Sequence, residues 1–148
     1  MLQPIPTKFD GQVSLQKLTV TGPDTKHVLL VQTELQNNQI NMVGFSQSGI
    51  QLFQLSWQPN TEVRLTTSIV LPDIQAEQLL AYYQLSNWPE EDIQLGLQGM
   101  QLKNKPDKSH IRQFFIGQEL VFSVTQNKRF NSMLHHRDQY KIEIENID

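Results

Sequence analysis

The densest cluster of side chains that could do chemistry is His135-His136-Arg137-Asp138. Imidazole and carboxylate groups bind metals or transfer protons when they converge on one point. Adjacent side chains of an extended chain point to opposite sides, and no glutamate stands at helical ligand spacing from these histidines. The pattern therefore favours a solvated loop over a metal or catalytic centre.

The stretch Gly44-Phe45-Ser46-Gln47-Ser48-Gly49 has a distant likeness to the serine-nucleophile elbow of hydrolases. That elbow needs a glycine two residues after the serine and a helix behind it, whereas a serine and a β-hairpin pattern stand here. We predict a polar turn. An enzyme acting on an acyl substrate would also need a histidine such as His27 or His110 beside a serine or carboxylate, and the sequence shows no positioned pair. We therefore expect no enzyme, no catalytic residues, no metal site and no cofactor.

The region around Trp88 carries both acids and aromatic rings. Glu90-Glu91-Asp92 could act as paired acids, but they follow Pro89 in what reads as the first turn of a helix, where acidic side chains favour the helix dipole. Tyr82, Tyr83 and Trp88 could stack on a ligand. Such rings equally fill cores, so both readings stay open.

Composition narrows the possible functions. The chain has 148 residues, a net charge of −3 and no cysteine. This length predicts one domain, and the missing thiols exclude disulfides and thiolate metal sites. Only 12 lysines and arginines are present, without the concentrated basic footprint of a nucleic-acid-binding protein. The 20 scattered glutamines are predicted to cover outward strand positions.

No apolar run reaches the ~18 residues of a membrane-spanning helix. Met1-Leu2-Gln3-Pro4-Ile5-Pro6 lacks the basic and apolar regions of an export signal. The residues leave open a cytoplasmic protein or an exported one whose signal has been removed. The prolines suggest an extended, poorly ordered lead-in.

Alternating apolar and polar residues separated by turn residues predict an antiparallel meander. A parity change after Leu15 predicts a bulge near Gln16-Lys17. Four consecutive apolar residues from Val28 to Val31 predict a strand covered on both faces. Asn37-Asn38 suits a tight hairpin. The predicted strands are residues 13–20, 27–35, 40–45, 50–57, 61–67, 100–102, 111–116, 119–124 and 139–145, with a loop at 127–138.

Two helices are predicted between the fifth and sixth strands. Asp73 is the candidate N-cap of the first, and Pro89 begins the second. On a helical wheel, one side carries Ala76, Leu79, Leu80 and Tyr83, and nearly the opposite side carries Ile74, Ala81 and Leu85. A helix that only packs on a sheet needs one apolar stripe. This helix must therefore bury both sides in protein, or contact the sheet on one side and an apolar ligand on the other.

Several stretches resemble a family of uncharacterised bacterial outer-membrane lipoproteins, which are often encoded in aryl-polyene-type gene clusters and are similar to the LolA/LolB lipoprotein carriers. The stretches are Gly49 to Leu55, Leu71-Pro72, Leu79 to Pro89 and Arg112-Gln113-Phe114. Gln84-Leu85-Ser86-Asn87-Trp88-Pro89 is the most specific, because the family shows a similar leucine, then aromatic, Trp-Pro pattern after its first helix. The likeness covers Val13 to Ile144.

The resemblance implies a mainly β fold with a two-helix insert, a half-open antiparallel β-barrel covered by helices. It divides the chain into an N-terminal tether at 1–10 and a single LolB-like domain at 11–148, with a helical lid at about 73–97. It also implies a lipid-anchored protein on the periplasmic face of the outer membrane, although the lipobox cysteine of such proteins is absent. LolB-type receptors display an apolar residue between their third and fourth strands, where Ser46-Gln47-Ser48-Gly49 is polar.

We expect a non-enzymatic lipoprotein that binds or carries an apolar chain, acyl or polyene-like, in outer-membrane lipid or lipoprotein trafficking. The alternative is an assembly or docking factor that binds a partner protein through an apolar groove. The expected partners are a hydrophobic ligand and a lipoprotein or membrane-assembly partner, but no nucleic acid. The predicted lining of the apolar cavity is Leu29, Val31, Leu55, Trp57, Leu79, Tyr83, Trp88 and Phe114.

Overall fold

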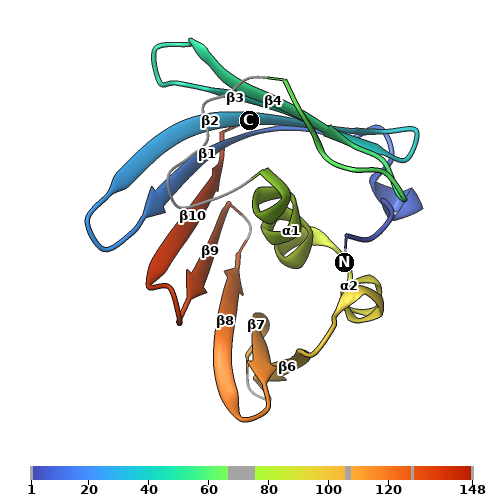
Figure 1. The fold of residues 1–148 in the computed structure, drawn as a ribbon, viewed down its shortest axis with the longest axis vertical. Helices are drawn as coiled ribbons and strands as arrows, with labels where there is room; N and C mark the ends of the chain where they lie inside the picture. Colours follow the sequence, from blue (N-terminus) through green and yellow to red (C-terminus); the bar gives the residue numbers. More distant parts are fainter. Residues whose placement is uncertain (1, 67–75, 106–107, 128, 148) are drawn as a thin grey trace.

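The computed structural model describes residues 2–66, 76–105, 108–127 and 129–147. In the described chain a short 3-10 helix is followed by five strands, two α-helices and five more strands (Figure 1). The elements are η1 (Thr7–Phe9), β1 (Val13–Thr21), β2 (Lys26–Gln36), β3 (Gln39–Phe45), β4 (Gln51–Trp57), β5 (Arg64–Leu65), α1 (Ala76–Asn87), α2 (Glu90–Gly96), β6 (Gln101–Lys105), β7 (Lys108–Ile116), β8 (Glu119–Gln126), β9 (Phe130–His135) and β10 (Tyr140–Asn146).

The strands form one antiparallel sheet in the order β5-β4-β3-β2-β1-β10-β9-β8-β7-β6. Figure 1 shows the sheet bent strongly, with α1 on its concave side and α2 beyond it. The predicted mainly β fold with two helices after the fifth strand is confirmed. The sheet is not closed, because β5 and β6 are its two edges.

The core lies on the concave face. Cross-strand register brings Leu18 opposite Leu29 on one side and opposite Ile144 on the other. The same alternation continues outward, with Met42 opposite Leu55 and Phe114 opposite Phe122. Leu79, Leu80 and Trp88 of the helical region join these residues in one buried cluster. The period-2 pattern thus builds an apolar inner surface that α1 covers.

The C-terminal end of α1 is tied to its surroundings at successive carbonyl groups. Asn87 Nδ2 donates to Tyr83 O over 2.7 Å, and Trp88 N donates to Gln84 O over 2.8 Å. Arg112 Nη1, from β7, donates to Leu85 O over 2.8 Å, and Gln126 Nε2, from β8, donates to Ser86 O. The last carbonyls of a helix have no partner within the helix, so these bonds fix where α1 ends and how it sits on the sheet.

Several local predictions are confirmed. Asn37 and Asn38 have φ values of 55° and 57°, as a hairpin turn of the I′ kind requires. Gly22 N donates to Thr25 O at the predicted first turn. The second helix is present as predicted but begins at Glu90, one residue after the predicted start, and Pro89 is its N-cap residue. The predicted helix start at Asp73, with Ile74, lies outside the described residues.

Four predictions need correction. The loop at 127–138 contains strand β9, because Phe130 to His135 pairs with β8 and β10. β1 has no bulge at Gln16-Lys17, since its register with β2 is continuous. The apolar Val13 and Leu15 lie on the opposite face from buried Gln16, which produced the parity change. Strand β2 alternates buried and half-buried residues instead of being covered twice, and β5 spans only Arg64–Leu65.

The N-terminal residues that the structure describes pack on the fold, and the division into a tether and a domain stays a prediction. Ile5 is buried, and its backbone N–H donates to Asn38 Oδ1 over 3.2 Å. The Phe9 ring lies 5.6 Å, centroid to centroid, from the indole of Trp88. Apolar side chains at these positions can bury area against the helices, which offsets the entropy of ordering the segment.

Candidate functional site

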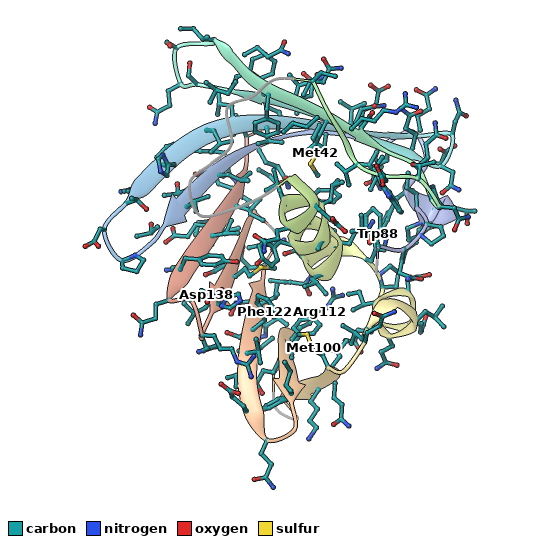
Figure 2. The ribbon with its side chains drawn as sticks, in the orientation of Figure 1. Met42, Trp88, Met100, Arg112, Phe122 and Asp138 are labelled. Carbon is teal, nitrogen blue, oxygen red and sulfur yellow. The ribbon has the colours of Figure 1, made fainter. Side chains whose placement is uncertain are left out.

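An apolar pocket of about 440 Å³ lies where α1, α2 and the β8–β9 part of the sheet meet. Its volume is within the range of small-molecule binding sites, about 300–1,000 Å³. Figure 2 shows Phe122 and Met100 on the side of α1 that faces β7 and β8, with Trp88 beside the segment that joins the helices. The apolar wall is formed by Leu2, Ala81, Leu85, Trp88, Ile93, Leu97, Met100 and Phe122.

One end of this pocket carries an aromatic and polar cluster. Tyr82 and Tyr140 share a hydrogen bond between their hydroxyls. The imidazole of His135 stacks on Tyr140 at 4.9 Å and meets the edge of Phe122 at 4.3 Å, centroid to centroid. Burial raises the pKa of Tyr82 and lowers the pKa of His135, so both groups favour their neutral forms. The pocket therefore ends in neutral hydrogen-bonding groups, without a fixed charge among them.

The N-terminal segment forms part of the pocket wall. Gln84 holds the backbone of Gln3 at two points: Gln3 N donates to Gln84 Oε1 over 2.8 Å, and Gln84 Nε2 donates to Gln3 O over 3.0 Å. The indole N–H of Trp88 also donates to Gln3 O, over 3.4 Å. These bonds satisfy the buried amide of Gln84 and place Leu2 against the pocket.

The structure separates the eight predicted lining residues. Leu29, Val31, Leu55, Leu79 and Phe114 are buried in the core, and Trp88 lines the apolar pocket. Trp57 is buried beside a small polar hollow near Gln58, and Tyr83 lies on the other side of α1 in a second, polar groove. The eight residues are thus distributed over the concave face, and this pocket brings together only Trp88 of them. Their role in ligand binding remains a prediction.

Sequence reasoning missed most of this pocket. Met100, Leu97 and Phe122 come from a connecting segment and from strand β8, and His135 from a strand that was predicted as a loop. Phe122, Val124 and Gln126 follow a period of two along β8, and Met133 and His135 follow the same period in the next segment. This period could have indicated β9, where Met133 pairs with Val124 and His135 with Phe122. Which of two helix sides faces which strand depends on register, and the sequence does not give register directly.

The sequence motifs with possible chemistry are spread apart. His135 is buried, while His136 is exposed and lies 3.0 Å from Ser123 Oγ on the outer face. Arg137 forms a two-point ion pair with Glu119, at 3.1 and 2.6 Å. Ser46 bonds to Ser48 and to Ile50 N within a hairpin turn, as predicted. Within the described ranges, no group of three metal-binding side chains is close enough to hold an ion.

The turn between β3 and β4 is polar at Ser46 to Gly49, but an apolar residue follows it directly. Ile50 is 66% exposed and lies just before β4 begins. None of the helices in the described residues is long and apolar enough to span a bilayer. An exposed apolar residue beside a polar turn is a small contact surface, well below the size of a typical protein interface.

An open antiparallel sheet curved around a helix, with an apolar pocket at the joint of the two helices, places the protein in the mainly β class. Within that class, the chain belongs to the family described as "Protein of unknown function (DUF3261)", whose family model matches residues 13–148. A search of curated proteins gave no match.

Proposed function

We propose that this protein binds an apolar chain, acyl or polyene-like, in the pocket between α1, α2 and β8, and that it does so as a binding or carrier protein, not as an enzyme. The single observation that carries the proposal is the pocket of about 440 Å³, whose walls are mostly aliphatic and aromatic. Two of its buried polar side chains, Gln84 and Tyr82, are already paired within the protein, and the lining also includes Glu77, Gln78, Gln98 and His135. A ligand would therefore gain affinity chiefly from buried apolar area, at about 25 cal/mol per Å².

A half-open barrel of the LolA/LolB kind, a lipid-anchored position at the outer membrane and a role in lipid or lipoprotein trafficking are parts of the same proposal. The open, curved sheet around α1 supports it at the level of architecture. The stretch from Gln84 to Pro89 supports it because its Trp-Pro pair forms the α1–α2 joint that borders the pocket. Fold alone does not establish function, so binding has to be measured.

The direct test is native mass spectrometry of the protein purified from its own membrane, followed by titration of the delipidated protein with a fluorescent palmitate analogue. We expect a co-purified apolar molecule and saturable probe binding. Met100→Trp should fill the pocket and weaken binding about tenfold or more, which corresponds to about 1.4 kcal/mol. Leu95→Trp is the matched control, since Leu95 is on α2 but is 79% exposed.

Equal binding by both variants would contradict the pocket assignment. Capture of a partner protein by a protein that binds no palmitate would favour the docking alternative. Circular dichroism and thermal melts of both variants separate loss of binding from loss of fold.

A further inference from the structure

A second hollow, of about 500 Å³, lies on the other side of α1 and has a different chemistry. It is lined from β1, β8, β9, β10 and the C-terminal end of α1 almost entirely by amide and hydroxyl side chains. They include Ser14, Gln16, Asn87, Gln126, Asn131 and Asn146. We call this hollow the amide groove.

The polar side chains of the groove occupy positions of the sheet that are apolar elsewhere. On β1, Ser14 and Gln16 stand on the same face as buried Leu18. Gln16 is opposite Asn146 on β10, and its Nε2 donates to Asn146 Oδ1 over 2.8 Å. Gln126 on β8 is opposite Asn131 on β9. The side chains of the concave face thus change from aliphatic to amide at one end of four adjacent strands. A buried core would instead favour apolar side chains at these positions.

Two side chains at the groove retain unused hydrogen-bonding capacity. Ser86 is fully buried at the base, and its hydroxyl has no partner within the described parts of the chain. Asn131 is half-buried, and no bond of its amide is seen among those same residues. An unpaired buried hydroxyl lowers stability, so a ligand group that enters at the base and pairs with it would be favoured.

We infer that the amide groove is a binding site for a neutral saccharide, and this site is independent of the apolar pocket proposed above. An amide presents both donors and an acceptor, and a sugar hydroxyl is both donor and acceptor, so a ring of amides can satisfy several hydroxyls at once. The side of Tyr83 supplies an aromatic surface at the groove, and burial raises its pKa to about 12, which keeps the phenol neutral. The other lining residues are uncharged, and Arg129 is the one formal charge among them, so the groove offers mainly neutral hydrogen-bonding groups.

The test is a titration of the full chain with glucose, maltose and N-acetylglucosamine, followed by proton–nitrogen NMR spectra of the side-chain amide groups. We expect the amide signals of Gln126, Asn131 and Asn146 to shift in a saturable way with at least one of these sugars. Asn131→Leu, which keeps the branched shape and removes the amide, should weaken that binding about five- to tenfold, as expected for the loss of one hydrogen bond. Asn41→Leu is the matched control, because Asn41 is a half-buried asparagine in β3 outside the groove.

Ser86→Ala separates binding from structure. If the hydroxyl is paired only when a ligand is bound, Ser86→Ala binds the sugar more weakly. It melts at the same or a higher temperature, because an unpaired buried polar atom has been removed. A lower melting temperature would show that the hydroxyl has a structural partner and would overturn this part of the inference. Absence of amide shifts with all three sugars, or the same shifts with the neutral tripeptide Ala-Gln-Ala and none with sugar, would overturn the saccharide assignment.

Discussion

The two sides of α1 differ in what they do with polar side chains. On the side of the apolar pocket, the Gln84 amide bonds to the backbone of Gln3 through both its oxygen and its nitrogen, and the Tyr82 hydroxyl is hydrogen-bonded to the Tyr140 hydroxyl. On the side of the amide groove, Ser86 is buried without a partner in the described chain. Gln84 and Ser86, two residues apart on α1, therefore belong to different surfaces. On the first surface, hydrogen bonds within the protein pair Gln84 and Tyr82, and much of the remaining lining is apolar. On the second surface, the Ser86 hydroxyl has no hydrogen-bond partner among the described residues.

A helix inside a curved sheet can therefore line two separate hollows, here the apolar pocket and the amide groove. α1 has no single apolar stripe, because Leu79 and Leu80 pack in the core while Leu85 and Ala81 border the pocket. The remaining side carries Tyr83, Ser86 and Asn87. The joint at Trp88 lies between the two spaces, so changes there should affect both, whereas changes at their linings should affect only one.

The largest effect is expected at Trp88. Its side chain is fully buried and contacts Phe9 and Tyr83, each at 5.6 Å between ring centroids. Trp88→Ala should lower the free energy of unfolding by about 3–5 kcal/mol and weaken ligand binding on both sides of α1. Urea unfolding with Leu95→Ala as the control measures this. A loss of stability below about 1 kcal/mol would contradict the structural role of Trp88, and unchanged binding on either side of α1 would show that the joint does not couple the two spaces.

A smaller effect is expected at the two bonds that tie α1 to the sheet. Arg112→Ala leaves the part-buried Leu85 carbonyl without its charged donor and should cost about 1.5–3 kcal/mol, while Gln126→Ala removes a neutral donor from Ser86 O and should cost about 1 kcal/mol. Arg112→Lys, which keeps the charge, is the control for Arg112→Ala. Denaturant midpoints rank the variants, and equal losses would mean that the charged and neutral anchors contribute alike.

The pH dependence should depend on His135, at the end of the apolar pocket. Its burial lowers its pKa below the ordinary value near 6.5, against the opposing effect of Asp138, whose carboxylate is 3.4 Å from Nε2. Tyr140 and Phe122 face the same ring, and His136 and Arg137 add positive charge nearby. The unfolded chain binds the proton more readily, so this contribution to stability is present above about pH 6.5 and is lost progressively as the pH falls below that value.

Melting temperatures between pH 5 and 7.5 test this expectation. His135→Gln should flatten the profile over that range. A profile that His135→Gln does not alter would place the titrating group elsewhere.

The smallest effect on stability is expected at Asn131, where the comparison becomes sharpest. Asn131→Leu should change the free energy of unfolding by less than about 0.5 kcal/mol, as for a partly exposed residue without a structural bond. It should leave palmitate binding unchanged, and Met100→Trp should leave sugar binding unchanged. Crossed effects, in which either variant weakens the other ligand, would show that the pocket and the groove are one connected site.

Much of the fold could be predicted from the sequence because its signals are local. Alternation from Tyr140 to Asn146, the Asn37-Asn38 turn and the proline before α2 each depend on residues close together in the chain. Strand β9 escaped prediction because Asn131, Ser132 and His135 have weak strand preference. It is a strand because β8 and β10 supply hydrogen-bond partners on both sides.

The sequence by itself determined the mainly β class, the position of the two helices, the break at Trp88-Pro89 and the absence of thiol chemistry. Only the tertiary structure decided which side chains share a space. Gln84, Trp88 and Gln3 meet although 81 residues separate the two glutamines, and the amides of β1, β8, β9 and β10 gather through cross-strand register. The physical reason is that register and helix orientation are set by long-range packing, so residues that are distant in the chain become neighbours only when the sheet is assembled.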